Sequence, residues 1–292
     1  MGPRQWEGTI QCGLEQGKKF GIMGSTDQHA GYPGSYGDGR IGVLAESLTR
    51  DKIWDAMKNR HVCCATGDKI NIDFRLNDAF PGDVVRGNSR RIYLNVEGGS
   101  CIDYIDIVKN RKCIARLSGP LLPEMPEGDM VRCKVKIDFG WNREEQYVHW
   151  QGKLSISKGT INAVEPCFRG AAFTSPQPGE PEFETKVNRI VSVTDKDTEL
   201  DMYSSKNPNT TTPAMQAVIL DVTMPKDGMI TAEFNGKKFE HSLGELLEGS
   251  RSHFMIGWLS EAILFNRAMP ESCFMVEHYI CLLYTSPSPR DS

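Results

Sequence analysis

The chain has 292 residues, of which 39% are hydrophobic and 25% are charged, and its formal net charge is −4 at pH 7. These values are ordinary for a globular protein of about two domains. The charge is mild and forms no block of one sign, so it gives no support to a nucleic-acid partner. No apolar run approaches the roughly 18 residues that a spanning helix needs, so we expect no membrane span.

The first segment with a clear pattern is helical. Trp6, Ile10 and Leu14 recur every four residues, which places them on one face of a helix over residues 6–16. A short apolar run, Phe20–Met23, follows and is typical of a buried strand. We therefore expect a helix and then a strand before the glycine-rich loop that begins at Gly24.

Two more strands and a second helix are expected before residue 68. The runs Ile41–Glu46 and His61–Thr66 are short and apolar, as buried strands are. Between them, Thr49 is a good N-cap for a helix whose buried face contains Ile53 and Trp54. The succession of helix, strand, loop, strand, helix and strand predicts α/β organisation over residues 1–68.

Beyond residue 68 the pattern changes to strict alternation of apolar and polar residues. This period of two is typical of half-buried antiparallel strands, because successive side chains of a strand point to opposite faces. Asn235-Gly236 is a strong signal for a tight hairpin turn, and Ser242 with Glu245 forms a capping box that begins a helix. The alternating segments are 70–76, 92–96, 131–139 and 218–222. They predict a mainly β, sandwich-like domain over residues 69–280.

Residues 281–292 do not continue this pattern. Their sequence, CLLYTSPSPRDS, matches over Cys281–Asp291 the translation of a common transposon-based sequencing adapter. We therefore treat this segment as a non-native tail and exclude it from fold reasoning. The biological sequence is then expected to end near Ile280, as part of a longer protein.

The nine cysteines include no C-x-x-C pair. Several of them, such as Cys101, Cys113 and Cys133, lie in strand-like runs. This distribution predicts buried or reduced thiols instead of a disulfide framework or a zinc knuckle.

The candidate chemistry lies in the loop that begins at Gly24. Asp27 and His29 are two residues apart, so an extended backbone points both side chains to the same side. A carboxylate and a neutral imidazole are ligands for zinc, manganese or iron, and the glycines of GSTDQHAGYPG let the backbone approach a metal or a substrate closely. Asp27 and His29 are therefore candidate metal ligands and candidate catalytic residues.

An isolated D-x-H pair also has an ordinary structural interpretation. An aspartate in a glycine-rich loop usually caps a turn, and a catalytic zinc site takes about three protein ligands. The remaining histidines show no ligand spacing; they are His61, His149, His241, His253 and His278. The pair on its own is therefore a hypothesis.

A resemblance to a known family adds to this hypothesis. The segments FGIMGSTDQHAGYPG and GVLAESLTRDKIWDAMKNRHVCCATGDKI resemble the C-terminal end of the catalytic domain in an uncharacterised family of PHP-type proteins, the polymerase-and-histidinol-phosphatase superfamily. The later segment SLGELLEGSRSHFMIGWLSEAILFNRAMPE resembles the β-rich C-terminal region of the same family. The resemblance implies that residues 1–68 are the end of a distorted α/β barrel, which holds a cluster of metals and hydrolyses phosphoesters.

Within that resemblance, Asp27 and His29 fall on the superfamily's last metal motif, whereas its early H-x-H motif and its other ligands have no counterpart here. The implied function is part of a metal-dependent hydrolase with zinc, manganese or iron as its divalent ion, which this chain alone does not complete or bind tightly. Arg40 and Tyr32, on the same loop, are candidate groups for an anionic substrate, such as a small-molecule or carbohydrate-linked ester. Packing at the loop surface is their alternative role.

Two other functions remain open. In the first, the β-rich region is a sandwich that binds a carbohydrate or a protein and has no catalytic activity. Its tryptophans Trp141, Trp150 and Trp258 would then form a platform for a sugar; burial in the core is the alternative role for them. In the second, the β-rich region is a structural domain that supports the α/β part. A large exposed aromatic patch on the sandwich would favour the binding module.

Overall fold

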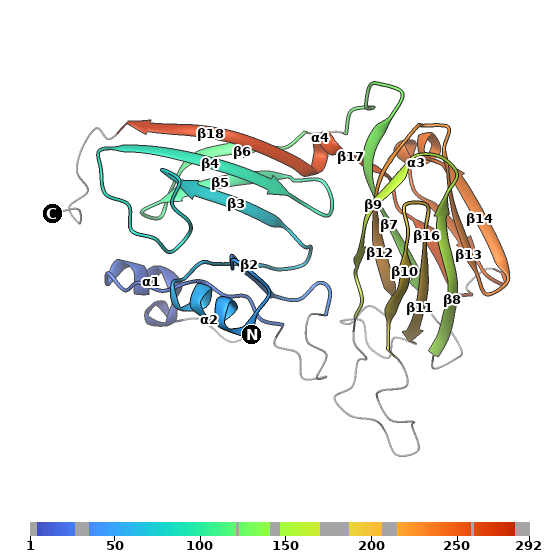
Figure 1. The fold of residues 1–292 in the computed structure, drawn as a ribbon, viewed down its shortest axis with the longest axis horizontal. Helices are drawn as coiled ribbons and strands as arrows, with labels where there is room; N and C mark the ends of the chain where they lie inside the picture. The colour runs from blue at the N-terminus through green and yellow to red at the C-terminus, as the bar shows by residue number, and fades with distance from the viewer. Residues whose placement is uncertain are drawn as a thin grey trace, which may run out of the picture.

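The computed structural model describes residues 5–26, 35–120, 123–140, 147–169, 187–205, 215–257 and 260–283. They form two lobes that lie side by side (Figure 1). The small lobe contains the described residues up to 120 together with the last strand, β18 (Met275–Leu283), and the sandwich lobe contains the described residues from 123 to 274. The chain therefore returns to the small lobe after completing the sandwich.

Two antiparallel sheets pack face to face in the sandwich lobe. The first consists, in spatial order, of β15 (Arg251–Phe254), β16 (Ala262–Phe265), β7 (Val131–Gly140), β12 (Gln216–Met224) and β9 (Thr160–Pro166), with β17 (Met269–Pro270) also paired to β7. The second consists of β10 (Arg189–Val193), β11 (Asp197–Ser205), β8 (Tyr147–Ile156), β13 (Met229–Phe234) and β14 (Lys237–Ser242). The two sheets form a β-sandwich inside the range 69–280 that was predicted as one sandwich-like domain, but β3 to β6 and β18 of that range belong to other sheets.

The main core of the molecule lies between these two sheets. Every second residue of β7 over 131–139 is at most 4% exposed, as the alternation predicts. The ring of Phe139 packs against Trp150 and Phe234 of the second sheet, with centroid separations of 5.6 Å and 4.7 Å. The helix α3 (Leu243–Glu248), which joins β14 to β15, buries its three leucines in the same core. Full burial of each large apolar side chain contributes about 1.5–3 kcal/mol, so this core is the main source of stability.

The small lobe has a second core. β3 (Asn71–Leu76), β4 (Ser89–Glu97) and β18 form an antiparallel sheet in the order β18-β4-β3, and the hairpin of β5 (Tyr104–Lys109) and β6 (Lys112–Ser118) packs on it. The buried residues between the sheet and the hairpin are Ile92, Leu94, Val96 and Ile107. The expected domain boundary at Ile280 falls inside β18, and residues 284–292 lie outside the described residues. The adapter origin of 281–292 stays a prediction.

The first 68 residues differ from the expected α/β barrel. The described part of this range, residues 5–26 and 35–68, contains a short 3-10 helix, η1 (Trp6–Gly8), two helices, α1 (Ile10–Glu15) and α2 (Arg50–Lys58), and two strands, β1 (Arg40–Val43) and β2 (Val62–Ala65). The two strands pair antiparallel, from Arg40 opposite Ala65 to Val43 opposite Val62. Since all paired strands in the described part of the chain are antiparallel, the protein is mainly β and the predicted α/β fold class was wrong.

The error has a physical cause. A short apolar run predicts a buried strand, but it does not show whether the neighbouring strand runs parallel or antiparallel to it. A helix between two strands usually crosses over to a parallel partner, whereas α2 here lies in a connection that brings β2 back antiparallel to β1.

The expected strand Phe20–Met23 is also absent. In the structure these residues belong to no helix or strand, and Phe20, Ile22 and Met23 are 37%, 41% and 58% exposed. A strand requires a partner for its backbone hydrogen bonds, and among the described residues no strand pairs with this segment. Apolar character alone was therefore not sufficient to predict it.

Predictions that depend on local geometry are confirmed. The four alternating segments form β3, β4, β7 and β12. Asn235 and Gly236 both have positive φ, 49° and 77°, as the tight turn between β13 and β14 requires. The capping box of Ser242 and Glu245 begins α3. Thr49 precedes α2 as expected, although its side chain makes no capping hydrogen bond. None of the helices in the described ranges has the length and apolar character that a membrane crossing requires.

A histidine pair links the two sheets at one edge of the sandwich. His241 on β14 and His253 on β15 approach with their Nε2 atoms 2.7 Å apart, and their rings are stacked with an interplanar angle of 20°. The His253 ring also stacks on Phe239 at a centroid distance of 4.4 Å. Burial, and then the neighbouring His241, lower the pKa of His253.

Acidification is therefore expected to destabilise the sandwich. Since the pKa of His253 in the folded state lies below its unfolded value of about 6.5, the unfolded chain binds more protons between the two values. The stability that is present above about pH 6.5 is then lost as the pH falls through the folded-state pKa. Replacing His253 by Phe keeps the stacking on Phe239 and should remove this part of the pH dependence. Urea unfolding between about pH 7.5 and pH 5 tests it; an equal loss of stability in both proteins would contradict it.

Candidate functional site

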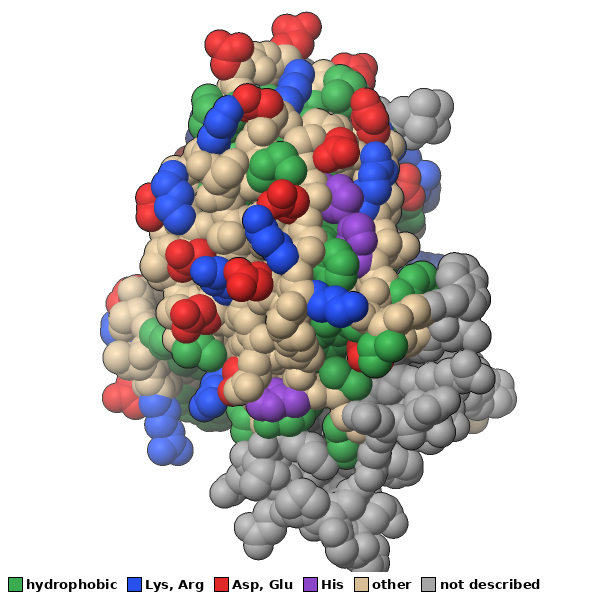
Figure 2. Space-filling model, turned by 90° about the vertical axis from the view of Figure 1, so that its right-hand side faces the viewer, with side chains coloured by type: hydrophobic (Ala, Val, Ile, Leu, Met, Phe, Trp, Pro, Cys, Tyr) green, Lys and Arg blue, Asp and Glu red, His purple; other side chains and the backbone are tan. Residues whose placement is uncertain are grey.

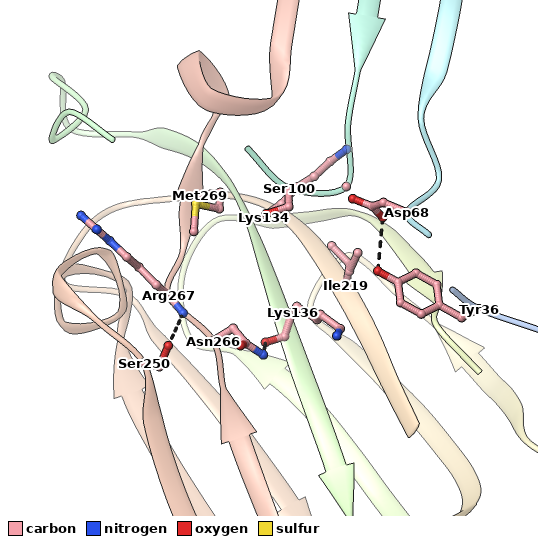
Figure 3. A pocket seen from close by; sticks show the side chains of 11 residues that line it. Tyr36, Asp68, Ser100, Lys134, Lys136, Ile219, Ser250, Asn266, Arg267 and Met269 are labelled. Atoms are coloured by element: carbon pink, nitrogen blue, oxygen red, sulfur yellow. Dashed lines mark hydrogen bonds between the residues drawn. The ribbon is translucent and has the colours of Figure 1, made fainter. Parts of the chain in front are cut away.

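A cleft lies between the two lobes, over the outer face of the sheet that contains β7 and β12 (Figure 3). Its volume is about 190 Å³, below the roughly 300–1,000 Å³ of pockets for drug-sized ligands. We call it the inter-lobe cleft, and its lining residues are Tyr36, Asp68, Gly99, Ser100, Lys134, Lys136, Ile219, Ser250, Asn266, Arg267 and Met269. The first four belong to the small lobe, so the cleft depends on the contact between the lobes.

The charged wall of the cleft is the outer face of β7. Because the apolar residues of β7 point into the sandwich, the residues between them point outward; these are Arg132, Lys134, Lys136 and Asp138. The neighbouring strand β12 places Asp221 opposite Lys134 and Ile219 opposite Lys136. This face is covered by the small lobe, and Lys134 and Asp138 are only 8% and 7% exposed.

Arg132 is fully engaged in holding the lobes together. Its Nε and Nη2 atoms donate to the two carboxylate oxygens of Asp221, at 3.1 Å and 2.6 Å. The same guanidinium donates to Glu97 of the small lobe at 3.0 Å and to Glu271 of α4 (Glu271–Phe274) at 2.8 Å. With three carboxylates around one guanidinium, Arg132 is a structural residue and not a free anion-binding group.

Lys134 and Lys136 differ in how strongly neighbouring residues hold their ammonium groups. The Lys134 ammonium lies 2.8 Å from a carboxylate oxygen of Glu97 and donates to the carbonyl oxygen of Gly98 at 2.8 Å, so it is fixed in place and paired as a buried lysine must be. The Lys136 side chain is 34% exposed and pairs with Asp138 at 3.0 Å. It is therefore the lysine of this wall that a ligand can contact with least rearrangement.

Three cations surround the ring of Tyr36. Arg40, Lys136 and Arg169 lie 5.3, 5.5 and 5.5 Å from its centroid, within the range of cation–π attraction. Among the described residues, neither Arg40 nor Arg169 forms an ion pair with a carboxylate. Arg40 and Arg169 therefore lie beside Tyr36 without a direct carboxylate contact in this part of the chain.

The Tyr36 hydroxyl remains a donor. It donates to Oδ1 of Asp68 at 3.4 Å (Figure 3), and its pKa is raised well above the usual value, first by burial and then by Cys167 and Asp68. Asp68 also accepts from the backbone amide of Lys69 at 2.9 Å. Gly99 allows this arrangement, because a Cβ atom at that position would lie 2.3 Å from Oδ1 of Asp68.

Two polar atoms near the cleft are buried without a hydrogen-bond partner among the described residues: Nε of Arg40 and Oε1 of Glu165. Burial raises the pKa of Glu165, although Lys69, Lys134 and Arg40 act in the opposite direction. Buried polar groups are normally paired, so an unpartnered donor and an unpartnered acceptor indicate a place where a polar ligand or water is accommodated.

Of the predicted site residues, Asp27, His29 and Tyr32 lie outside the described residues, so their roles stay predictions. The chain on either side of them is described. Ser35 is buried at 3% exposure, Tyr36 lines the cleft, and a Cβ atom on Gly24 would lie 2.6 Å from the backbone oxygen of Arg40. The segment that contains the D-x-H pair therefore leaves and re-enters the described structure beside Arg40 and Tyr36.

The described donors do not complete a metal site. No group of three or more metal-ligating side chains is present among the residues that the structure describes. Of the carboxylates near the cleft, Asp68 accepts from Tyr36 and from the Lys69 amide, whereas Oε1 of Glu165 has no hydrogen-bond partner among the described residues. Among the charged side chains that line the cleft, lysine and arginine outnumber aspartate, which favours an anionic ligand.

The proposed tryptophan platform does not form at Trp150. This side chain is fully buried and donates from Nε1 to Ser204 at 2.9 Å, whereas Trp141 and Trp258 lie outside the described residues. The strongly exposed apolar side chains of the described sandwich lobe are aliphatic; they are Met125, Met130, Val187, Val191, Val193 and Ile256. Figure 2 shows acidic and basic side chains interspersed on the face that this lobe presents. The described part of the sandwich therefore offers no large aromatic patch.

Sequence reasoning missed most of the cleft. Tyr36 and Asp68 follow the expected metal loop and the expected third strand, but they match no motif. The segment VRCKVKIDF did offer a signal. It places four ionisable residues on one face of a strand, which is unusual for a face that is covered. Nothing local in the sequence indicates that the small lobe covers it.

Comparisons of the chain with protein-family models, with curated proteins and with solved structures found no match. Evidence for a function therefore comes from the residues of the cleft and from the D-x-H motif of the sequence.

Proposed function

We propose that this chain forms the anion-binding part of a metal-dependent hydrolase that acts on phosphoester-like substrates, with Asp27 and His29 as two of its metal ligands. The observation that supports it best is the cationic surroundings of Tyr36, two residues after the glycine that ends the D-x-H loop. Arg40, Lys136 and Arg169 lie around one tyrosine ring, and two of them have no carboxylate partner in the described part of the chain.

Each residue has a role that follows from its chemistry. Lys136 and Arg40 attract the anionic group, and Arg40 is also the residue that the sequence proposed for contact with an anionic substrate. The Tyr36 hydroxyl is held protonated by its raised pKa and donates to Asp68, so it adds no negative charge that would repel an anion. Ser100, which lines the cleft, supplies a neutral donor, whereas the Asn266 amide already donates to the Lys136 carbonyl oxygen and to Asp138. A bound metal would supply Lewis-acid activation of water, with Asp27 and His29 as the only ligands that this chain's sequence proposes.

Anion binding is expected to depend on Lys136. Replacing Lys136 by Met keeps a long apolar stem and removes the charge, and a hydrogen bond to a charged group contributes roughly 1.5–3 kcal/mol. We expect the dissociation constant for phenyl phosphate to rise about tenfold or more. Isothermal titration calorimetry at low salt measures it, with circular dichroism to confirm that the variant is folded.

The matched control is Lys238→Met. Lys238 is 58% exposed and pairs with Glu240 on β14, far from the cleft in the second sheet. Its replacement should leave phenyl phosphate binding unchanged. Equal binding by Lys136→Met and the unmodified chain, or an equal loss in the two variants, would show that the cleft does not bind the anion.

Metal binding gives an independent test of the D-x-H pair. A catalytic zinc site takes about three protein ligands, and Asp27 and His29 supply two. Loss of the residues that orient the ligands lowers affinity or activity by a further ~10–100-fold. We expect this chain to bind Zn²⁺ or Mn²⁺ weakly and to leave phosphoesters intact. In a longer protein that contains the remaining ligands, His29→Ala should remove most of the activity. Tight stoichiometric binding by this chain, or full activity of that variant, would overturn this assignment without affecting the anion test.

A further inference from the structure

Two cysteines from different parts of the chain meet beside the inter-lobe cleft. Cys101 lies in the 98–103 loop between β4 and β5, and Cys273 lies on α4, which connects the sandwich to β18. The Cys101 side chain is close enough to raise the pKa of Cys273. They differ in accessibility, since Cys101 is exposed and Cys273 is fully buried.

Backbone hydrogen bonds on both sides hold the pair in register. The amide of Ile102 donates to the carbonyl oxygen of Cys273 at 2.8 Å, and the amide of Gly98 donates to that of Phe274 at 2.9 Å. The 98–103 loop and α4 are therefore adjacent along several residues, and the backbone alone places Cys101 next to Cys273. All nine cysteines are free in the structure.

We propose that Cys101 and Cys273 form a reversible disulfide through exchange with a low-molecular-weight disulfide such as oxidised glutathione. The exposed Cys101 thiolate attacks one glutathione sulfur, the glutathione disulfide bond breaks, and one glutathione thiolate leaves. The Cys273 thiolate then attacks Sγ of Cys101 and displaces the second glutathione, while the proton of Cys273 passes to solvent. Two protein thiols are oxidised and one glutathione disulfide is reduced to two thiols.

The second step is the slow one. Burial, and then Cys101, raise the pKa of Cys273 to about 11, so only a small fraction is thiolate at neutral pH. Below this pKa, the thiolate fraction and with it the rate of closure should rise about tenfold per pH unit. Oxidation is therefore expected to be slow at neutral pH and to report sustained oxidising conditions.

The disulfide would act on the cleft through the 98–103 loop. Gly99 and Ser100 line the cleft, and the carbonyl oxygen of Gly98 accepts from Lys134. A covalent bond from Cys101 to α4 fixes these residues against the sandwich lobe. The site thus couples the redox state of the chain to the shape of one wall of the cleft.

The experiment treats the folded chain with oxidised glutathione at about pH 8, blocks free thiols with N-ethylmaleimide, and maps the peptides by mass spectrometry. We expect a peptide that joins Cys101 to Cys273 in most molecules, reversed by reduced glutathione. Cys101→Ser, at an exposed position, should abolish it. Cys113→Ser should retain it, because Cys113 is equally exposed but lies on the β5–β6 hairpin.

Cys273→Ala provides the second arm. In this variant the Cys101–glutathione adduct should accumulate, because the attacking thiol is missing. A stable adduct on the unmodified chain without the joined peptide would overturn the proposal. So would a joined peptide that connects Cys101 to Cys113 or to Cys133, the buried neighbour of Cys273.

Discussion

Replacing Trp150 by Ala is expected to lower the free energy of unfolding by about 3–5 kcal/mol, the range for removing a large aromatic side chain from a packed core. Trp150 is fully buried, packs against Phe139, and donates its indole N–H to Ser204. Its removal leaves a cavity between the two sheets that the surrounding strands cannot close. Urea unfolding, followed by circular dichroism, measures the change.

The control is the same substitution at Trp54. This side chain is 55% exposed on α2, where it contacts Lys58 at 5.4 Å. Trp54→Ala should change the stability by less than about 1 kcal/mol. Similar effects of the two substitutions would show that the sandwich core is not where the structure places it. A small effect at Trp150 would also revive the interpretation of this residue as part of an exposed platform.

Replacing Arg132 by Met is expected to destabilise the chain by about 3 kcal/mol. Removing one partner of a buried ion pair costs more than the pair contributes, because the remaining charge stays buried without compensation. The side chain of Asp221 is 8% exposed and would keep only the amide of Asn162 as a side-chain donor to Oδ1. Glu97 and Glu271 would lose the guanidinium that joins them across the two lobes.

Arg75→Met is the matched control for this prediction. Arg75 also forms a two-pronged pair, with Asp73, but both side chains are 39% exposed. Exposed pairs contribute about 0–1 kcal/mol, so the control should be nearly neutral. Equal losses for Arg132→Met and Arg75→Met would show that Arg132 is not the residue that holds the lobes together.

The parts of the fold that could be predicted from the sequence depend on local geometry. The alternation of Val131–Phe139 determines which face of β7 is buried, whatever strand lies beside it. Asn235 and Gly236 tolerate positive φ, and Ser242 with Glu245 satisfies the first amides of α3; each signal is complete within a few residues. Such signals remain valid in almost any tertiary context.

The parts that failed depend on a partner far away in the sequence. The direction of β1 relative to β2 is decided by how the connection packs, and the two runs look the same in either case. Phe20–Met23 is apolar enough for a buried strand, yet no described strand pairs with it. Hydrophobicity predicts that a segment is suited to burial, and the pairing decides whether it becomes a strand.

The candidate site also divides into residues that a local pattern indicated and residues that only the tertiary structure identifies. Asp27, His29 and Tyr32 were proposed from a short motif and a resemblance, and they stay predictions because they lie outside the described residues. Arg40 was also proposed from the sequence, and the structure places its guanidinium over the ring of Tyr36. Lys136 could not be identified from the sequence. Its proposed role depends on its contact with the ring of Tyr36, which lies 100 residues earlier in the chain.

The central claim, that the inter-lobe cleft binds an anion, is tested most directly by a crystal structure grown with tungstate, a phosphate analogue whose metal atom gives a strong anomalous signal. We expect an anomalous peak in the cleft, in contact with Lys136 and near Tyr36, and its loss in crystals of Lys136→Met. A cleft without a peak, with tungstate found only at exposed lysines such as Lys158 and Lys238, would contradict it.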